Sequence, residues 1–217
     1  MILLTGFEPF GGETVNPSWT AAQLAATALQ AAGRNAAAVE LPCVFGKSAE
    51  VLRDAIGRLQ PMLVLCVGQA GGRSRISIER VAINVDDARI PDNAGNAPID
   101  QPVRLGGPAA YFSTLPIKAG RAAVAAAGLP VEVSQTAGTY VCNSVFYALM
   151  DALAGLDGVR GGFIHVPFSD EQGLRHGQPG LAVEDMAAAL TLVATAALTA
   201  DGDLVDGDLR MAAGAEH

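Results

Sequence analysis

The chain has few cysteines and few charged residues, and each shortage excludes a class of protein. It contains three cysteines in 217 residues, an odd number placed too far apart for a disulfide framework or for the C-x₂₋₄-C pairs of a zinc finger. Charged residues make up 17%, below the roughly 25% usual in soluble domains, which favours extensive buried surface, including a subunit contact. We therefore expect free thiols in a reducing cytoplasm, and a homo-oligomer fits the composition.

Basic residues and long apolar runs are also scarce. Lys and Arg total 14 against 22 Asp and Glu, a net charge of -8, and a surface of this sign repels phosphate backbones and anionic lipids. The apolar start of the chain, residues 1–6, has no basic flank and soon meets a turn. The apolar run at 186–200 is short and rich in alanine. We expect neither a nucleic-acid partner nor a membrane role.

Short apolar runs typical of strands alternate with runs typical of helices over the first 200 residues. The run at 62–67 is apolar without alternation, as expected for a central strand covered on both faces. The run at 76–84 alternates and then changes phase near Glu79, which predicts a bulge or a break. The predicted strands are at 2–5, 38–41, 62–67, 76–84, 131–134 and 162–166, and the predicted helices at 18–32, 47–59, 117–127, 143–154 and 183–199.

This order predicts an α/β fold with one domain at 1–200 and a doubly wound, mostly parallel twisted sheet, whose ligands bind at the carboxyl ends of the strands. Asn16 before a proline supplies a cap for the first helix, and Gly33 its end. Prolines, glycines and asparagines at 86–105 predict a long ordered or lid-like loop. The acidic, glycine-containing tail at 201–217 is expected to be frayed.

The turn after the first strand is rich in glycine but does not match a phosphate loop. It lacks the G-x-G-x-x-G pattern, and Glu13 follows Gly12 where a Walker loop carries lysine. Phe7 and Phe10 suit a small, flat, apolar ligand better than a phosphate. Both aromatics are equally explained as core residues.

Cys142 follows a predicted strand and opens a predicted helix. A thiol at that position meets the positive end of the helix dipole, which we expect to lower its pKa and favour the thiolate nucleophile. Cys66 lies inside an apolar strand and Cys43 follows a proline, so core packing explains both. For Cys142 alone, an inert core thiol remains an alternative.

A catalytic thiolate needs a base, and the chain offers three histidines. His217 is the last residue and His176 lies in a glycine-flanked loop, whereas His165 ends an apolar strand at the rim where sites form. A hydrogen-bonded structural histidine is the alternative for His165.

A carboxylate that orients the imidazole would complete a triad. Glu79 lies in a mostly apolar strand and therefore needs a partner. Its alternative role is an ion pair with Arg73 or Arg80, which is common on strand edges.

A divalent metal site is a further alternative that the spacing does not favour, because it matches no helical ligand motif. The four candidate ligands are His165, Asp170, Glu171 and His176. We nevertheless expect no metal at this position.

Several motifs occur in one order along almost the whole chain to about residue 200. Together they resemble the type I pyroglutamyl peptidases, also called pyrrolidone-carboxylate peptidases. The motifs lie at 4–12, 16–19, 68–73, 78–84, 88–93, 136–143 and 163–167.

The resemblance implies a cysteine exopeptidase that removes an N-terminal pyroglutamyl residue from blocked peptides, with Cys142, His165 and Glu79 as the triad. It also implies a three-layer α/β/α sandwich, no cofactor, and a homo-oligomer that in this family is often a tetramer. The implied substrate pocket has Phe7 and Phe10 around the lactam ring, Asn16 and Gln69 at its polar groups, Arg89 near the oxyanion site, and Ile90, Tyr140 and Val141 along the remaining wall.

Two positions depart from the family pattern. Tyr140 and Cys43 stand where phenylalanine and threonine are frequent, a change expected to alter the fit modestly. The implied chemistry is acyl transfer, with thiolate attack by Cys142, proton delivery to the leaving amine by His165, and backbone N–H groups at the helix start on the oxyanion. The rival functions are another hydrolase or phosphorylase on a similar sheet, and a silent module that binds blocked peptide ends.

Overall fold

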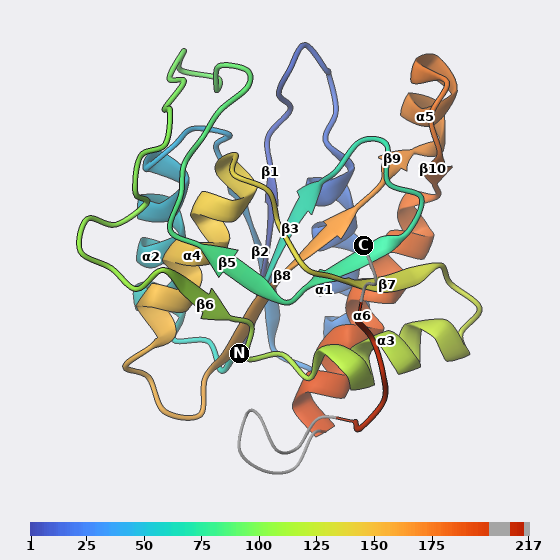
Figure 1. The fold of residues 1–217 in the computed structure, drawn as a ribbon. Helices are drawn as coiled ribbons and strands as arrows, with labels where there is room; N and C mark the ends of the chain where they lie inside the picture. Colours follow the sequence, from blue (N-terminus) through green and yellow to red (C-terminus); the bar gives the residue numbers. More distant parts are fainter. Residues whose placement is uncertain (200–208, 215–217) are drawn as a thin grey trace.

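The computed structural model describes residues 1–199 and 209–214, and its centre is a twisted sheet of six strands (Figure 1). The strands are β1 (Ile2–Phe7), β2 (Ala36–Leu41), β3 (Leu63–Gln69), β4 (Ile76–Glu79), β7 (Val131–Ser134) and β8 (Arg160–Val166). Their order across the sheet is β2-β1-β3-β8-β4-β7.

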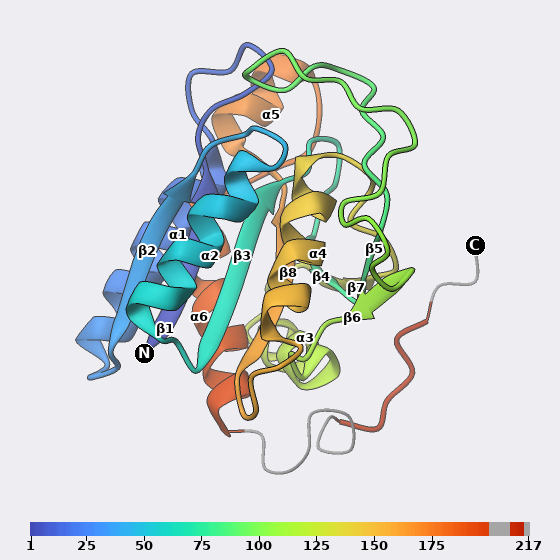
Figure 2. The same ribbon diagram turned by 90° about the vertical axis from the view of Figure 1, so that its left-hand side faces the viewer.

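Helices cover both faces of this sheet (Figure 2). One face carries α1 (Pro17–Ala31), α3 (Ile117–Ala126) and α6 (Val183–Thr199), and the other carries α2 (Lys47–Leu59) and α4 (Val141–Leu153). Alternate residues of β1, β2, β3 and β8 enter two separate hydrophobic clusters, as the two-residue repeat of a strand requires. The predicted three-layer α/β/α sandwich is therefore confirmed.

The sheet is mostly parallel, as predicted, with two strands reversed. β1, β2, β3 and β8 are parallel, whereas β4 is antiparallel to β8 and β7 is parallel to β4. The connection from β3 to β4, residues 70–75, is too short for the crossover that a parallel return needs. This reversal places Ser77 directly opposite His165.

The predicted break near Glu79 is also present. β4 ends at Glu79, and β5 (Val81–Ile83) leaves the main sheet to pair with β6 (Ala110–Phe112) in a separate two-stranded ribbon. Neither β6 nor the short elements near the end of the domain were expected from the sequence. The latter are β9 (Phe168–Ser169), α5 (Asp170–His176) and β10 (Gly180–Leu181).

The first helix begins and ends as predicted. Asn16 is its N-cap, Pro17 its first residue, and Gly33 adopts a positive φ of 75° just beyond its end. At the other side of the turn, Gly6 lies so close to the helix that an added Cβ would approach the Trp19 backbone to 2.4 Å. The first loop is thus held tightly between β1 and α1.

Long loops gather at the carboxyl ends of β1, β3 and β8, at the top of Figure 1. The predicted loop at 86–105 is present and contains one isolated bridge, Asp86 to Gln101. Most of the tail at 201–217 lies outside the described residues. Within 209–214, the Ala213 carbonyl accepts a hydrogen bond from Arg80 Nη2 at 3.4 Å.

No helix in the described part of the chain is both long and apolar enough to cross a membrane.

Candidate active site

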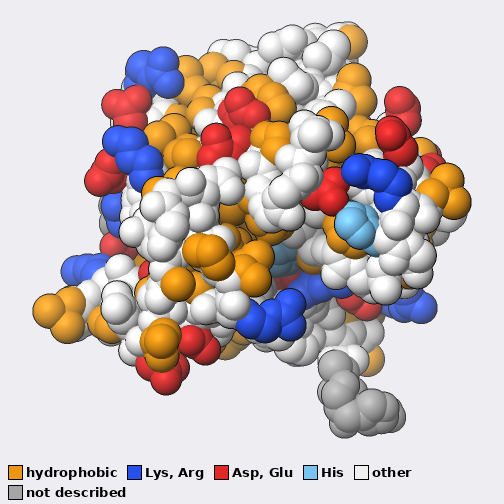
Figure 3. All heavy atoms as spheres, turned by 90° about the horizontal axis from the view of Figure 1, so that it is seen from above, with side chains coloured by type: hydrophobic (Ala, Val, Ile, Leu, Met, Phe, Trp, Pro, Cys, Tyr) orange, Lys and Arg blue, Asp and Glu red, His pale blue; other side chains and the backbone are white. Residues whose placement is uncertain are grey.

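Cys142, His165 and Glu79 converge on one face of the sheet, the face that carries α2 and α4. His165 lies two residues after Phe163, which enters the cluster under α4, and Glu79 lies two residues after Ser77, the strand partner of His165. Alternation along each strand therefore places both side chains on the α4 side. Figure 3 looks down on the loops at the top of Figure 1 and shows hydrophobic side chains gathered near the middle of this view.

Cys142 is the second residue of α4, which starts at Val141 after the N-cap Tyr140. No side chain among the described residues caps this helix start. The Asn143 side chain is bonded elsewhere: its Oδ1 accepts from Ile83 N at 3.0 Å, and its Nδ2 donates to the Ile83 and Val85 carbonyls. The first N–H groups of α4 therefore remain as donors beside the thiol.

The absence of a side chain at Gly68 makes room for Cys142. Gly68 is the register partner of His165 on the neighbouring strand. A Cβ at this position would lie 2.7 Å from Cys142 Sγ and 2.8 Å from Phe163 Cζ, and the Phe163 ring centroid is 4.9 Å from that of His165. The sulfur thus lies over β3 and β8 in the neighbourhood of the imidazole.

Glu79 and His165 are in direct contact. Glu79 Oε1 is 2.7 Å from His165 Nδ1, and both side chains are buried, Glu79 completely. With a proton on Nδ1 directed at the carboxylate, the free electron pair of the imidazole is on Nε2. This is the tautomer that a proton acceptor for a thiol requires.

The ion pair considered as an alternative for Glu79 also exists. Arg73 Nη1 lies 2.7 Å from the same Oε1, so one carboxylate oxygen serves both partners, while Oε2 has no hydrogen-bond partner among the described residues. Arg80 points away and bonds Gln135.

The expected low pKa of Cys142 is wrong for the free protein. Burial raises the pKa of the thiol well above its usual range, and the nearby Cys43 and the Glu79 charge add to this, while Arg73 opposes it. The helix dipole is outweighed because the sulfur is packed against the sheet. A thiol with a raised pKa needs a neighbouring base before it can act as a nucleophile, and the His165 imidazole lies on the same face of the sheet.

The other two cysteines lie in the core, as predicted, and all three thiols are free. Burial raises the pKa of Cys43 and of Cys66 to about 12 each.

Aromatic side chains from three loops meet beside Cys142. The Tyr140 ring centroid is 6.2 Å from that of Phe10 and 5.3 Å from that of Phe45, the latter in a T-shaped arrangement. The Tyr140 hydroxyl donates to the Pro91 carbonyl at 3.1 Å and contacts Cys43. The two departures from the family pattern are therefore neighbours, and Tyr140 joins the long loop to the start of α4.

Two of the predicted pocket residues, Phe7 and Asn16, have their main contacts inside the protein. Phe7 is 2% exposed and packs against Phe163. Both polar atoms of the Asn16 side chain are used, since Oδ1 accepts from Ser18 and Nδ2 donates to the Glu8 carbonyl. Asn16 shapes the loop rather than presenting a free amide.

Gln69 points away from the catalytic face. Its neighbour Gly68 faces Cys142, so the Gln69 side chain projects to the other side of the sheet, where Oε1 accepts from Gln172 Nε2 at 3.3 Å. The side chain expected to arrange the polar contacts of the lactam is thus directed towards α5.

The remaining predicted pocket residues lie at the start of α4 and on the long loop that is bonded to it. Val141 is fully buried directly before Cys142, and Ile90, 43% exposed, precedes the proline that bonds Tyr140. Arg89 is exposed on the same loop. The loop is tied to the helix start by two hydrogen bonds between Asp87 and Thr139, at 2.9 and 2.8 Å.

Polar residues that join the loops were not singled out from the sequence. Glu8 Oε1 accepts from Cys43 N and from Asn93 Nδ2, and Asp92 Oδ2 accepts from Phe45 N. The motifs that contain Glu8 and Asn93 were the available signal, but nothing in the sequence paired them. These bonds hold the first loop, the start of α2 and the long loop together around the aromatic cluster.

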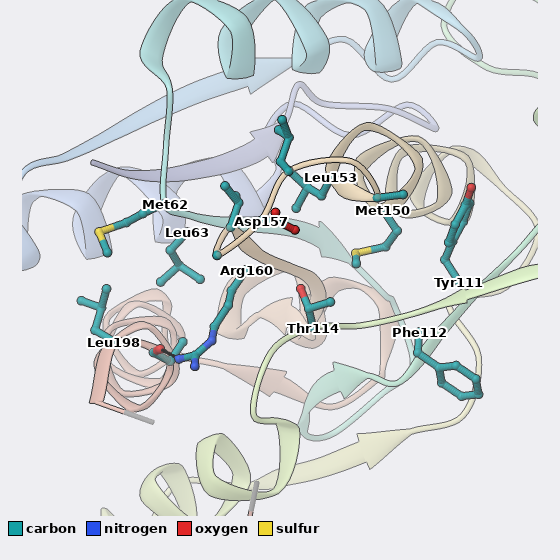
Figure 4. A pocket seen from close by; sticks show the side chains of 15 residues that line it. Met62, Leu63, Tyr111, Phe112, Thr114, Met150, Leu153, Asp157, Arg160 and Leu198 are labelled. Carbon is teal, nitrogen blue, oxygen red and sulfur yellow. Dashed lines mark hydrogen bonds between the residues drawn. The ribbon is translucent and has the colours of Figure 1, made fainter. Parts of the chain in front are cut away.

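A cavity of about 710 Å³ lies at the opposite end of the sheet (Figure 4). Its lining includes Leu63 and Arg160, the first residues of β3 and β8, and Leu153 at the end of α4. It is therefore remote from Cys142.

Within residues 1–199 and 209–214, no group of three potential ligands lies close enough to hold a metal ion. His165 contacts Glu79, whereas His176 contacts Glu13 at 2.6 Å. The two histidines of the metal alternative thus serve different carboxylates.

Known proteins resemble this chain over almost its whole length. The sequence model of the family described as pyroglutamyl peptidase matches residues 1–200. The pyrrolidone-carboxylate peptidase of Escherichia fergusonii is 52% identical over 217 residues, covering 100% of this chain and 99% of that protein. That of Klebsiella pneumoniae is 57% identical over 199 residues, covering 91% and 92%.

Solved structures give the same result. The crystal structure of Bacillus amyloliquefaciens pyroglutamyl peptidase I has a TM-score of 0.85 at 46% identity, covering 95% of this chain and 98% of that one. A mutant pyrrolidone carboxyl peptidase from Pyrococcus furiosus has a TM-score of 0.82 at 40% identity, with 91% and 97% covered. With such identity over nearly its full length, the chain belongs to the pyroglutamyl peptidase family.

Proposed function

We propose that this protein is a pyroglutamyl peptidase I, which removes an N-terminal pyroglutamyl residue from peptides by acyl transfer through Cys142. The observation that carries the proposal is the contact between His165 Nδ1 and the buried Glu79 Oε1 at 2.7 Å, on the sheet face to which Cys142 Sγ is packed. A buried carboxylate that orients an imidazole beside a thiol is the arrangement of a nucleophilic triad.

In the first step, His165 Nε2 accepts the Cys142 proton while sulfur attacks the pyroglutamyl carbonyl carbon. Because burial raises the pKa of the thiol, this transfer accompanies attack and the protein does not store a thiolate beforehand. The resulting imidazolium is stabilised by Glu79. His165 then returns the proton to the departing amine, which leaves a thioester on Cys142.

The negative oxygen of the tetrahedral intermediate needs donors that are already in place. The uncapped N–H groups at the start of α4 provide them, each worth about 3 kcal/mol in comparable sites. In the second step, water activated by His165 attacks the thioester and releases pyroglutamate. No cofactor takes part in this scheme.

The aromatic cluster accounts for the choice of substrate. Phe10 and Tyr140 form apolar walls for a flat, neutral lactam, with Phe7 beneath them in the core. An N-terminal proline would bring a charged amine into these walls and lacks the lactam carbonyl. Burying that charge unpaired costs several kcal/mol, so a preference for pyroglutamyl substrates of about a thousandfold or more is expected.

The test is release of a fluorophore from a pyroglutamyl amide by the wild-type protein, by Cys142→Ala and by the matched core variant Cys66→Ala. We expect Cys142→Ala to fold normally and lose activity by several orders of magnitude, and Cys66→Ala to lose stability instead. A silent binding module would bind the amide without cleaving it. Full activity in Cys142→Ala would refute the mechanism.

Assembly and location complete the proposal. A homo-oligomer, with a tetramer as the expected form, is supported by large apolar side chains at the surface, including Phe112 at 69% and Leu174 at 85% exposed. Three free thiols support a reducing cytoplasm. Light scattering on the purified protein measures the assembly, and a monomer at working concentration would contradict it.

A further inference from the structure

Arg73 lies in the turn that connects β3 to β4, where its backbone N–H bonds the Ala70 carbonyl at 3.3 Å. Its side chain is 28% exposed and runs from this turn into the site. Neither the sequence motifs nor the triad chemistry assigns it a role beyond that of an ion-pair partner.

The guanidinium joins two separate parts of the site. Nη1 donates to Glu79 Oε1 at 2.7 Å, and Nη2 donates to the Thr136 carbonyl at 3.2 Å. Thr136 belongs to the segment between β7 and α4, six residues before Cys142. One planar group therefore ties the carboxylate of the triad to the segment that leads into the nucleophile helix.

The carboxylate needs this cation because Glu79 is completely buried. A neutral His165 contributes a hydrogen bond but no charge, and the adjacent Arg80 is directed at Gln135 and Ala213. Burying an ionised carboxylate without a counter-charge costs several kcal/mol. Arg73 is the cation in contact with Glu79 among the described residues.

Arg73 binds Glu79 without displacing His165 from the same carboxylate. Arginine commonly grips both oxygens of a carboxylate, but here the second nitrogen goes to Thr136 and Oε1 alone is shared with His165. The same oxygen is thereby held by Arg73 while it keeps its 2.7 Å contact with Nδ1. Burial raises the pKa of the Cys142 thiol, and the positive charge of Arg73 partly offsets this rise.

We propose that Arg73 is a positioning residue of this site, which compensates the charge of buried Glu79 and fixes it against His165 while holding the approach to α4 through Thr136. The inference rests on the proposed function, because the roles of Glu79 and His165 are part of it. Arg73 touches no reacting atom in the scheme and acts through Glu79.

The experiment compares Arg73→Ala and Arg73→Lys with Arg75→Ala, using a pyroglutamyl amide and separate values of kcat and KM. Arg75 is exposed in the same turn, and the Ser77 hydroxyl donates to its backbone carbonyl, which the substitution keeps. Arg75→Ala should therefore match the wild type. We expect Arg73→Ala to lower kcat about 10- to 100-fold, the range found for partners that orient a reacting group, with KM nearly unchanged.

Rescue separates positioning from a general loss of structure. Arg73→Lys keeps the charge and should regain several-fold of the lost kcat, and added guanidinium should raise the kcat of Arg73→Ala but not that of Glu79→Gln. Circular dichroism checks folding. If Arg73→Ala does not fold, Arg73→Gln replaces it, with the same expected loss of kcat.

The outcomes distinguish this inference from the proposed function. If the wild type is active and Glu79→Gln is impaired, a kcat of Arg73→Ala equal to that of Arg75→Ala overturns the role of Arg73 alone. An impaired Arg73→Ala that neither lysine nor guanidinium improves also overturns it. Full activity in Glu79→Gln, or none in the wild type, instead refutes the triad or the substrate.

Discussion

Replacing Gly68 by alanine is the smallest change that reaches the nucleophile without altering any catalytic side chain. The added methyl group would lie 2.7 Å from Cys142 Sγ, 2.8 Å from Phe163 Cζ and 3.0 Å from Phe163 Cε1. Ordinary contact begins at about 3.4 Å. Sulfur or ring must therefore move by about 0.7 Å, inside a close-packed region where β3 and β8 are central strands.

The expected effects on stability and on catalysis can be separated. Overpacking a core by one methyl group costs about 1–3 kcal/mol of folding free energy. A displacement of about 1 Å at a reacting atom lowers the rate by about 100-fold. A shift of 0.7 Å, the value set by the contacts above, should then reduce kcat/KM by about 10- to 100-fold, or about 1.4–2.7 kcal/mol in the barrier.

The assay is kcat/KM on a pyroglutamyl amide together with urea unfolding, with Gly161→Ala as the control. In that control the new Cβ would meet Leu153 Cδ1 at 2.5 Å, at the opposite end of β8. We expect the control to lose stability and keep its kcat/KM. Wild-type kcat/KM in a folded Gly68→Ala variant would refute the placement of Cys142 Sγ over β3.

Three further predictions concern single polar groups. Glu79→Gln should keep KM and lower kcat by about 10²- to 10⁴-fold, because the imidazole loses its charged partner; an unchanged kcat would leave Glu79 a structural residue. Tyr140→Phe removes the 3.1 Å bond to the Pro91 carbonyl, worth about 1 kcal/mol, and should raise KM about fivefold at constant kcat; an unchanged KM would mean the long loop does not shape the pocket. Burial raises the pKa of Asp86 from 3.8 to about 6, so the folded state holds the proton more tightly and stability falls as pH rises from about 4 to about 6. Asp86→Asn should therefore raise the free energy of unfolding in urea at about pH 7, by an amount on the order of 1 kcal/mol for a partly buried group, and leave it unchanged near pH 4; equal changes at both pH values would contradict this.

The order of helices and strands could be predicted because apolar periodicity is a local property. The uninterrupted apolar run of β3 indicated a central strand, and the phase change near Glu79 marked the point where β5 leaves the sheet. Which strands are neighbours could not be predicted, since strand order depends on contacts distant in sequence. The pairing of Ser77 with His165, which brings Glu79 to the imidazole, is of this kind.

In the site, too, local features could be predicted from the sequence, whereas contacts between distant residues could not. Cys142 at a helix start was predictable from the strand, turn and helix pattern, but its raised pKa depends on how deeply the sulfur packs near Gly68. The direction of Gln69 towards Gln172 depends on α5, which a seven-residue run in a glycine-flanked segment did not reveal. The sequence left Arg73 and Arg80 as equal candidates for the ion pair with Glu79, and only the fold shows that Arg73 makes it.

The most direct test of the central claim is mass spectrometry of the enzyme quenched with acid during turnover of a pyroglutamyl amide. Acyl transfer through Cys142 predicts a fraction of protein that is heavier by one pyroglutamyl group, with the adduct on the peptide that contains Cys142 and lost on treatment with hydroxylamine. In Glu79→Gln, turnover should be slower while any adduct stays at the same residue. Turnover with the adduct on another residue, or turnover by a folded Cys142→Ala protein at the wild-type rate, would contradict the account.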